Sequence, residues 1–219
     1  MAPWGTNVVF RLGMTFYRRN LPHWFPEGRS IFTTWRLMGS LPQRGPKPLT
    51  ATKQLSPGQE FLRIDHVLDR AVFGPVWLSD PLVARPVVEK LCLEESQFRH
   101  CRLHAFVVMS NHVHLLMHPL VEVRRMMKAL KGVTARIANL ILGRTGESFW
   151  QDESFDHWVR DPTEFTRIKA YIEENPVKAG LVVKPGDWPW STAAAELANP
   201  FARAKYSRLL PSTGDSSLR

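Results

Sequence analysis

The amino-acid sequence predicts a single domain that contains both strands and helices. Its 219 residues are enough to build one domain with a sizeable core. Hydrophobic residues make up 44% of the chain and charged residues 22%, which is ordinary for a soluble globular protein. We expect an N-terminal extension at residues 1–16, the domain itself at residues 17–195 and a flexible tail at residues 196–219.

Four segments have the composition of strands. Residues 31–37 are rich in β-branched and aromatic side chains and follow a turn that contains glycine, so they are the first predicted strand. Residues 102–108 and 112–118 are expected to be neighbouring strands joined by residues 109–111. Residues 149–160 suit a further strand that is preceded by an irregular segment.

Two helices are predicted between the first and second strands. Residues 57–72 carry apolar side chains at helical spacing, which should place one face of this helix on the sheet. Asp80 and Pro81 are typical of the start of the next helix, which should run to about Glu95 with a kink at Pro86.

The third predicted helix follows Pro119, ends at Gly143 and has one apolar and one basic side. The apolar stripe consists of Met126, Leu130, Val133, Ile137 and Ile141. The basic side consists of Arg124, Lys128 and Lys131. The formal net charge is +9, so this side suits a contact with nucleic acid as well as it suits a solvated surface.

The fourth predicted helix begins at Asp161 and Pro162, which supply an N-cap and a proline at the first helical position. Glu164 is the acidic residue that a capping box requires. We expect Asn175 and Pro176 to end or kink this helix, because a residue that precedes proline is disfavoured in the α region.

The two cysteines of the chain, Cys92 and Cys101, have no paired spacing. They indicate neither a disulfide framework nor a zinc knuckle, and they predict a cytoplasmic protein. No apolar run approaches the roughly 18 residues that a membrane span needs.

His112 and His114 lie two residues apart on a predicted strand. Side chains alternate along a strand, so both imidazoles should project from one face of the sheet while Val113 and Leu115 enter the core on the other. Two neutral imidazoles at this spacing can bind one divalent cation. The alternative is that both histidines are only packed on the sheet.

Asp65 and Asp69 lie one turn apart on the first predicted helix. Paired carboxylates at this spacing can hold a metal ion. Arg63 and Arg70 are close in sequence, however, so a solvated helix face with ion pairs is the favoured interpretation.

Tyr171 and Asn175 lie one turn apart on the fourth predicted helix and face the same way. A phenol is a weak nucleophile unless its target is made more electrophilic, and a divalent cation held by the two histidines can do this by polarising a phosphodiester. The carbonyl oxygen of Asn175 is a candidate third ligand. Two imidazoles and one amide oxygen suit Mg²⁺ or Mn²⁺, although they do not exclude Zn²⁺.

Four segments in this order resemble the REP-associated tyrosine transposases, which are insertion-sequence-200-like transposases with an HUH motif and a single catalytic tyrosine. The segments are Tyr17–Trp24, Val108–His114, Phe149–Gln151 with Asp156–Arg160, and Tyr171–Val182. The resemblance implies an α+β, ferredoxin-like fold with an antiparallel sheet and helices packed mainly on one face. It implies that residues 17–195 form the transposase domain.

The same resemblance implies roles for individual residues. His112, His114 and Asn175 correspond to metal ligands, and Tyr171 corresponds to a nucleophile that forms a 5′-phosphotyrosine link to single-stranded DNA. The implied activity is that of a metal-dependent endonuclease and strand transferase, with Mg²⁺ or Mn²⁺ as cofactor.

The implied partner is single-stranded DNA that folds into hairpins at repetitive elements, bound by a monomer or homodimer in the cytoplasm near the nucleoid. Arg18 and Arg19, together with the basic side of the third helix, are expected to contact the DNA backbone. Two alternatives are a catalytically silent hairpin-binding or repressor protein and a structural zinc protein. The zinc alternative is disfavoured because the cysteines are badly spaced for a closed site.

Overall fold

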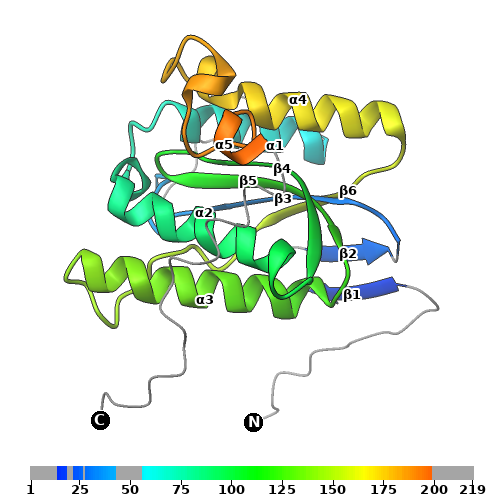
Figure 1. Cartoon of the computed structure of the whole chain (residues 1–219), viewed down its shortest axis with the longest axis horizontal. Helices are drawn as coiled ribbons and strands as arrows, with labels where there is room; N and C mark the ends of the chain where they lie inside the picture. The colour runs from blue at the N-terminus through cyan, green and yellow to red at the C-terminus, as the bar shows by residue number, and fades with distance from the viewer. Residues whose placement is uncertain (1–13, 19–21, 27, 43–55, 199–219) are drawn as a thin grey trace, which may run out of the picture.

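A four-stranded antiparallel sheet forms the centre of the computed structural model, which describes residues 14–18, 22–26, 28–42 and 56–198 (Figure 1). In spatial order the strands are β4 (Cys101–Val108), β5 (His112–Pro119), β3 (Ile31–Arg36) and β6 (Phe155–Trp158). Helices connect β3 to β4 and β5 to β6, which is the connectivity of a ferredoxin-like domain. The predicted α+β class and antiparallel sheet are confirmed.

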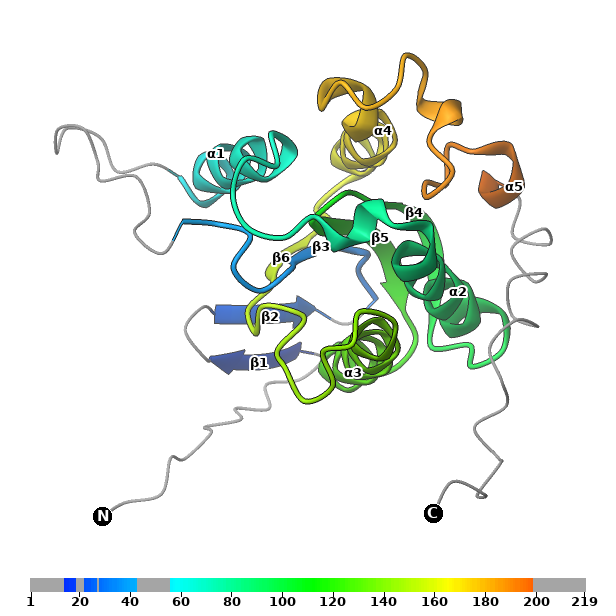
Figure 2. The same ribbon diagram turned by 90° about the vertical axis from the view of Figure 1, so that its left-hand side faces the viewer.

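Helices cover both faces of the sheet, which corrects the expectation that they pack mainly on one (Figure 2). One face carries α2 (Pro81–Ser96) and α3 (Val123–Ile141), and the other carries α1 (Pro57–Asp69) and α4 (Pro162–Lys178). Strand β5 explains this arrangement because its first six residues are all buried. Successive side chains of a strand point to opposite faces of the sheet, so a strand whose residues are all buried needs helices packed on both faces.

The side chains of β5 alternate as the sequence predicts. Val113, Leu115 and Met117 pack into the cluster that faces α2 and α3, whereas Leu116 packs into the cluster that faces α1 and α4. His112 shares its face with Leu116. The pair of imidazoles therefore points toward α1 and α4.

The cap residues fix where the helices begin. Ser56 and Gln59 form a capping box at α1, and Asp161 accepts a hydrogen bond from the backbone N–H of Glu164 at α4. Of the two alternatives for Asn175 and Pro176, an end of the helix is wrong, because α4 continues through Pro176 to Lys178. Proline removes a single N–H donor, and the helix ends within one turn anyway, so little is lost.

The buried stripe of α3 differs from the prediction. Val133 and Ile141 are exposed, at 38% and 42% of their surface, whereas Thr134 is buried. The Thr134 hydroxyl accepts a hydrogen bond of 2.9 Å from the indole N–H of Trp150, which makes its burial acceptable. The stripe that packs on the sheet is Met126, Leu130, Thr134 and Ala138.

The remaining elements lie at the edges of the fold. A hairpin of β1 (Met14–Arg18) and β2 (Pro22–Pro26) lies beside β6. The other elements are η1 (Trp77–Ser79), η2 (Pro185–Asp187) and α5 (Ala195–Ala198). The predicted boundaries of the domain remain predictions. Within the described ranges, no helix is both long and apolar enough to cross a membrane.

Candidate active site

Two buried imidazoles form the base of the site. The Nε2 atoms of His112 and His114 lie 3.0 Å apart, and neither side chain is exposed to solvent. Burial lowers the pKa of each histidine to about 3. Both rings are therefore neutral at physiological pH, which is the state in which imidazole binds a metal ion.

The hydrogen bonds around His112 fix its tautomer. The side-chain N–H of Asn111 donates to the carbonyl oxygen of Leu68 at 3.0 Å, so the amide oxygen of Asn111 faces His112. That oxygen lies 2.7 Å from Nδ1 of His112, which must therefore carry the proton. The lone pair of His112 Nε2 points into the site.

His114 is oriented from the neighbouring strand. Thr34 of β3 pairs with His114 across the sheet, and its hydroxyl lies 2.7 Å from Nδ1 of that histidine. If the hydroxyl accepts from Nδ1, then Nε2 of His114 also presents a lone pair to the site. Two lone pairs at 3.0 Å repel each other unless a proton or a cation lies between them.

Asp65 completes a group of three ligand atoms. Its Oδ1 atom lies 3.4 Å from Nε2 of His114 and 3.6 Å from Nε2 of His112, and among the described residues it has no hydrogen-bond partner. A cation about 2.1 Å from each ligand requires ligands about 3.0 Å apart in octahedral geometry and about 3.4 Å apart in tetrahedral geometry. These three side chains can therefore hold a metal ion.

The interpretation of Asp65 as part of a solvated helix face is wrong, because the residue is 1% exposed. A signal for this was present in the sequence. Asp65 lies on the same helical stripe as Phe61 and Leu68, both of which are buried. Burying a carboxylate in the middle of an apolar stripe costs free energy unless a cation or a hydrogen-bond donor pairs with it.

Asp69 lies one turn further along α1 at the edge of the same site. Its Oδ1 atom is 3.6 Å from Nε2 of His112 and is buried, with no hydrogen-bond partner in the described part of the chain. Burial, followed by the negative charge of Asp65, raises the pKa of Asp69 to about 7. The site therefore concentrates more negative charge than the protein alone stabilises.

Tyr171 approaches from α4 on the opposite side of Asp65. Its hydroxyl donates a hydrogen bond to Oδ2 of Asp65, and its ring meets the imidazole of His114 edge-on at a centroid distance of 5.7 Å. Burial, followed by the charge of Asp65, raises the pKa of the phenol above its ordinary value. A cation bound at the site would oppose this shift, because positive charge favours the ionised phenol.

Asn175 is fully buried one turn beyond Tyr171. Its Nδ2 lies 3.2 Å from Nε2 of His114, and its Oδ1 has no hydrogen-bond partner within the described ranges. A half-turn of the amide exchanges these two atoms and presents the oxygen to the site. The side chain can thus donate to an unmetallated imidazole or serve as a ligand.

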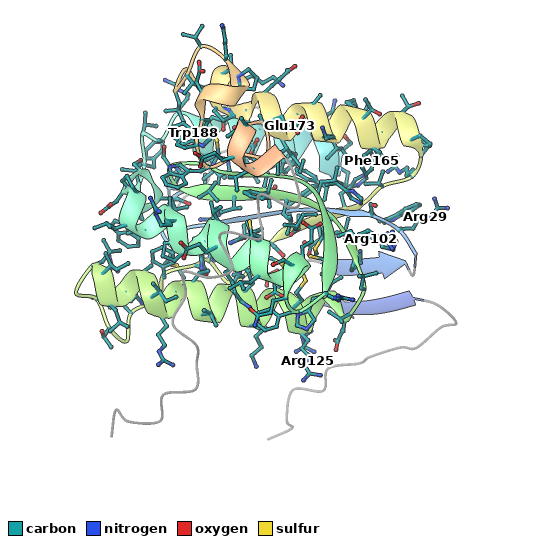
Figure 3. All side chains as sticks on the ribbon, in the orientation of Figure 1. Arg29, Arg102, Arg125, Phe165, Glu173 and Trp188 are labelled. Carbon is teal, nitrogen blue, oxygen red and sulfur yellow. The ribbon has the colours of Figure 1, made fainter. Side chains whose placement is uncertain are left out.

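The residues of α3 that are predicted to bind DNA do not lie at this site. Arg124 and Lys128 are exposed on α3, which packs on the other face of the sheet. Figure 3 shows the neighbouring Arg125 directed away from α4. Lys131 donates hydrogen bonds to the backbone oxygens of Gln151 and Asp152, at 2.6 and 3.1 Å.

The other two predicted DNA contacts cannot be placed. The side chain of Arg18 and the whole of Arg19 lie outside the described residues.

Similarity to known proteins agrees with the geometry. A sequence model of the family described as "Transposase IS200 like" matches residues 81–175. The REP-associated tyrosine transposase of Escherichia coli (strain K12) is 35% identical to this chain over 52 residues. The resemblance to the IS200-like transposases is confirmed.

The extent of these similarities is limited. The alignment with the E. coli transposase covers 24% of this chain, and the chain spans 32% of that relative's length. A solved structure described as a REP-associated tyrosine transposase bound to a REP hairpin is similar with a TM-score of 0.48 and 18% identity. That similarity covers 84% of this chain and 85% of the other.

The segment that matches the IS200-like family begins at the first residue of α2 and ends at Asn175. It therefore includes both histidines of the site and Tyr171. It does not include α1, which supplies Asp65. The tertiary structure, rather than the family match, brings this carboxylate to the imidazoles.

Proposed function

We propose that this protein is a metal-dependent endonuclease and strand transferase that acts on hairpin-forming, repetitive single-stranded DNA through a 5′-phosphotyrosine intermediate. One observation supports the chemistry above all. The hydroxyl of Tyr171 donates to Oδ2 of Asp65, and Oδ1 of the same carboxylate lies within 3.6 Å of the Nε2 atoms of both histidines. The hairpin substrate is proposed from the resemblance to the REP-associated tyrosine transposases, one of which is the similar protein of E. coli.

Three side chains would hold the cation: His112, His114 and Asp65, with the amide oxygen of Asn175 as a further ligand. The unpartnered, buried Oδ1 atoms of Asp65 and Asn175 favour such a role. A mixed set of oxygen and imidazole ligands suits Mg²⁺ or Mn²⁺. When bound, the cation polarises the phosphodiester and offsets negative charge in the transition state.

Tyr171 is the nucleophile in this proposal. Its hydroxyl oxygen forms a bond to phosphorus, its proton passes to Oδ2 of Asp65, and the bond between phosphorus and the 3′ oxygen breaks. The 3′ oxygen leaves with a proton from solvent as a free 3′-OH. The phosphotyrosine conserves the energy of the broken bond, so a 3′-OH of another strand can reverse the step without ATP.

Aromatic packing orients the phenol for this attack. The rings of Phe32 and Phe61 meet that of Tyr171 edge-on, at centroid distances of 6.3 and 6.2 Å. These contacts restrict the orientation of the ring.

A single chain supplies every group that the proposed reaction needs, because Tyr171 and Asp65 interact within one chain. This favours a protein that acts as a monomer, although a homodimer remains compatible with it. We place the protein in the cytoplasm, associated with the nucleoid, where its DNA substrate occurs.

The deciding experiment incubates the protein with labelled hairpin DNA and Mn²⁺ or Mg²⁺ and detects a covalent adduct on a denaturing gel. The wild type should form an adduct and Tyr171→Phe should form none. Tyr17→Phe and Tyr206→Phe change the other two tyrosines and are the matched controls that should retain it. An adduct that persists in Tyr171→Phe would assign the nucleophile elsewhere.

His112→Ala separates catalysis from binding. It should abolish the adduct and leave hairpin binding within a few-fold of the wild type, because affinity comes mainly from basic residues. His118→Ala, near the end of the same strand, is the control. Hairpin binding by the wild type with no adduct in either metal would instead support a silent hairpin-binding or repressor protein.

A further inference from the structure

A pocket of about 610 Å³ opens beside the proposed metal site. It lies between α1, strand β3 and residues 151–156, and its walls include Thr34 and Asp65, which also belong to the site. Figure 2 shows α1 on the face of the sheet that carries α4. Asp65 therefore lines the pocket and also accepts the hydrogen bond from Tyr171. Its volume is within the range of sites that enclose a small ligand.

Gln151, the last residue of the motif Phe149–Gln151, lines this pocket. Phe149 stacks on Trp77 at a centroid distance of 5.6 Å, and Trp150 meets Trp35 edge-on in the core. These two aromatic anchors fix the backbone, and the N–H of Gln151 donates to the carbonyl oxygen of Arg36 at 2.8 Å. The anchored segment presents the Gln151 side chain to the pocket.

The polar groups of the pocket are mostly hydrogen-bond acceptors. Asp65 and Glu153 are acidic residues of its lining, whereas the Asp156 carboxylate accepts a hydrogen bond from Thr33, whose side chain lies on the opposite face of β3 from Thr34. Of the described residues that line the pocket, only Arg36 is cationic. The carboxylates among the described lining residues favour a ligand that offers N–H donors.

The pocket also has an aromatic wall. Phe61 and Phe155 line it and stack on each other with centroids 4.3 Å apart. Unpaired bases bind proteins by contact with aromatic side chains and by hydrogen bonds along their edges.

We propose that this pocket binds one unpaired nucleobase of the strand that crosses the active site and that it prefers a base with an exocyclic amino group over thymine. The inference rests on the proposed function, since it takes DNA as the substrate. Guanine, adenine and cytosine each carry an amino group that donates hydrogen bonds to a carboxylate, whereas thymine offers a single ring N–H between two carbonyl oxygens, with a methyl group beside them. Arg36 and Gln151 can donate to the remaining acceptors of the base.

The test measures binding in EDTA, so it does not depend on cleavage. The probe is a labelled DNA hairpin with eight thymidines on each side, and one thymidine at a time is replaced by deoxyguanosine, deoxyadenosine or deoxycytidine. For the wild type, a replacement at one flanking position should tighten binding about fivefold or more in fluorescence anisotropy. Replacements elsewhere should have little effect.

Two pocket variants establish where the preference originates. Gln151→Ala should reduce the increase in affinity at that flanking position to less than about twofold. Glu153→Gln should shift the base preference toward thymine, because the new amide N–H can donate to a carbonyl oxygen of that base. Gln97→Ala, at an exposed position at the end of α2, should keep the preference of the wild type.

The outcomes separate this inference from the proposed function. A flat response at every flanking position, or a preference that survives both pocket variants, overturns the base pocket even if the tyrosine adduct forms. A position-specific preference that both variants remove supports the pocket even if no adduct forms.

Discussion

Asp69→Asn should stabilise the metal-free protein, and the gain should grow with pH. The side chain of Asp69 is 16% exposed, its Oδ1 lacks a hydrogen-bond partner within the described residues, and Asp65 places a second carboxylate beside it. Asparagine has nearly the same shape and no charge, so the substitution removes the cost of burying an anion while it preserves packing.

The magnitude follows from the pKa of Asp69, which rises from 3.8 to about 7 in the folded protein. A raised pKa means that the folded state binds the proton more tightly, so the wild type loses stability as the pH rises from about 4 through 7. Roughly three pKa units at about 1.4 kcal/mol each give a total of about 4 kcal/mol. Between pH 5 and pH 8 the advantage of the variant should increase by roughly 2–3 kcal/mol.

The assay is urea denaturation of both proteins in EDTA at pH 5 and pH 8, with Asp152→Asn at an exposed position as the control. The free energy of unfolding of the variant should exceed that of the wild type by more at pH 8 than at pH 5. An advantage that is absent, or equal at the two pH values, would refute the claim that Asp69 is a buried acid whose pKa is raised.

Three further substitutions test other features. Asp65→Asn should weaken Mn²⁺ binding at least about tenfold in calorimetry, because it removes a charged ligand, whereas Asp187→Asn should not change it. Gly74→Ala should lower the free energy of unfolding by more than about 1 kcal/mol, since φ is +68° and the new Cβ would lie 2.1 Å from a backbone oxygen. Trp150→Phe should cost about 1–2 kcal/mol in urea denaturation, because it leaves the buried Thr134 hydroxyl without its donor; unchanged stability would contradict this.

The sequence was sufficient for features that depend on periodicity within one element. The two-residue repeat of a strand places His112 and His114 on one face, and the helical repeat places Tyr171 and Asn175 on another. The caps at Asp80 and Asp161 are equally local. Each of these features is set by neighbours in the chain.

The sequence was insufficient wherever the answer depends on which element packs against another. The apolar stripe of α3 passes through Thr134 because Trp150, 16 residues further along the chain, offers a donor. The second pair of helices covers the far face of the sheet because β5 is enclosed on both sides. Neither packing arrangement can be predicted from the periodicity of a single element.

Asp65 marks the boundary between the two kinds of information most clearly. Its spacing from Asp69 and its arginine neighbours favour a solvated helix face, and only the docking of α1 over β5 brings it to within 3.6 Å of both imidazoles. The sequence by itself determined the donors that each element carries and the face on which they lie. Only the tertiary structure decided which donors meet, because the cost and role of a buried charge depend on the groups that surround it in space.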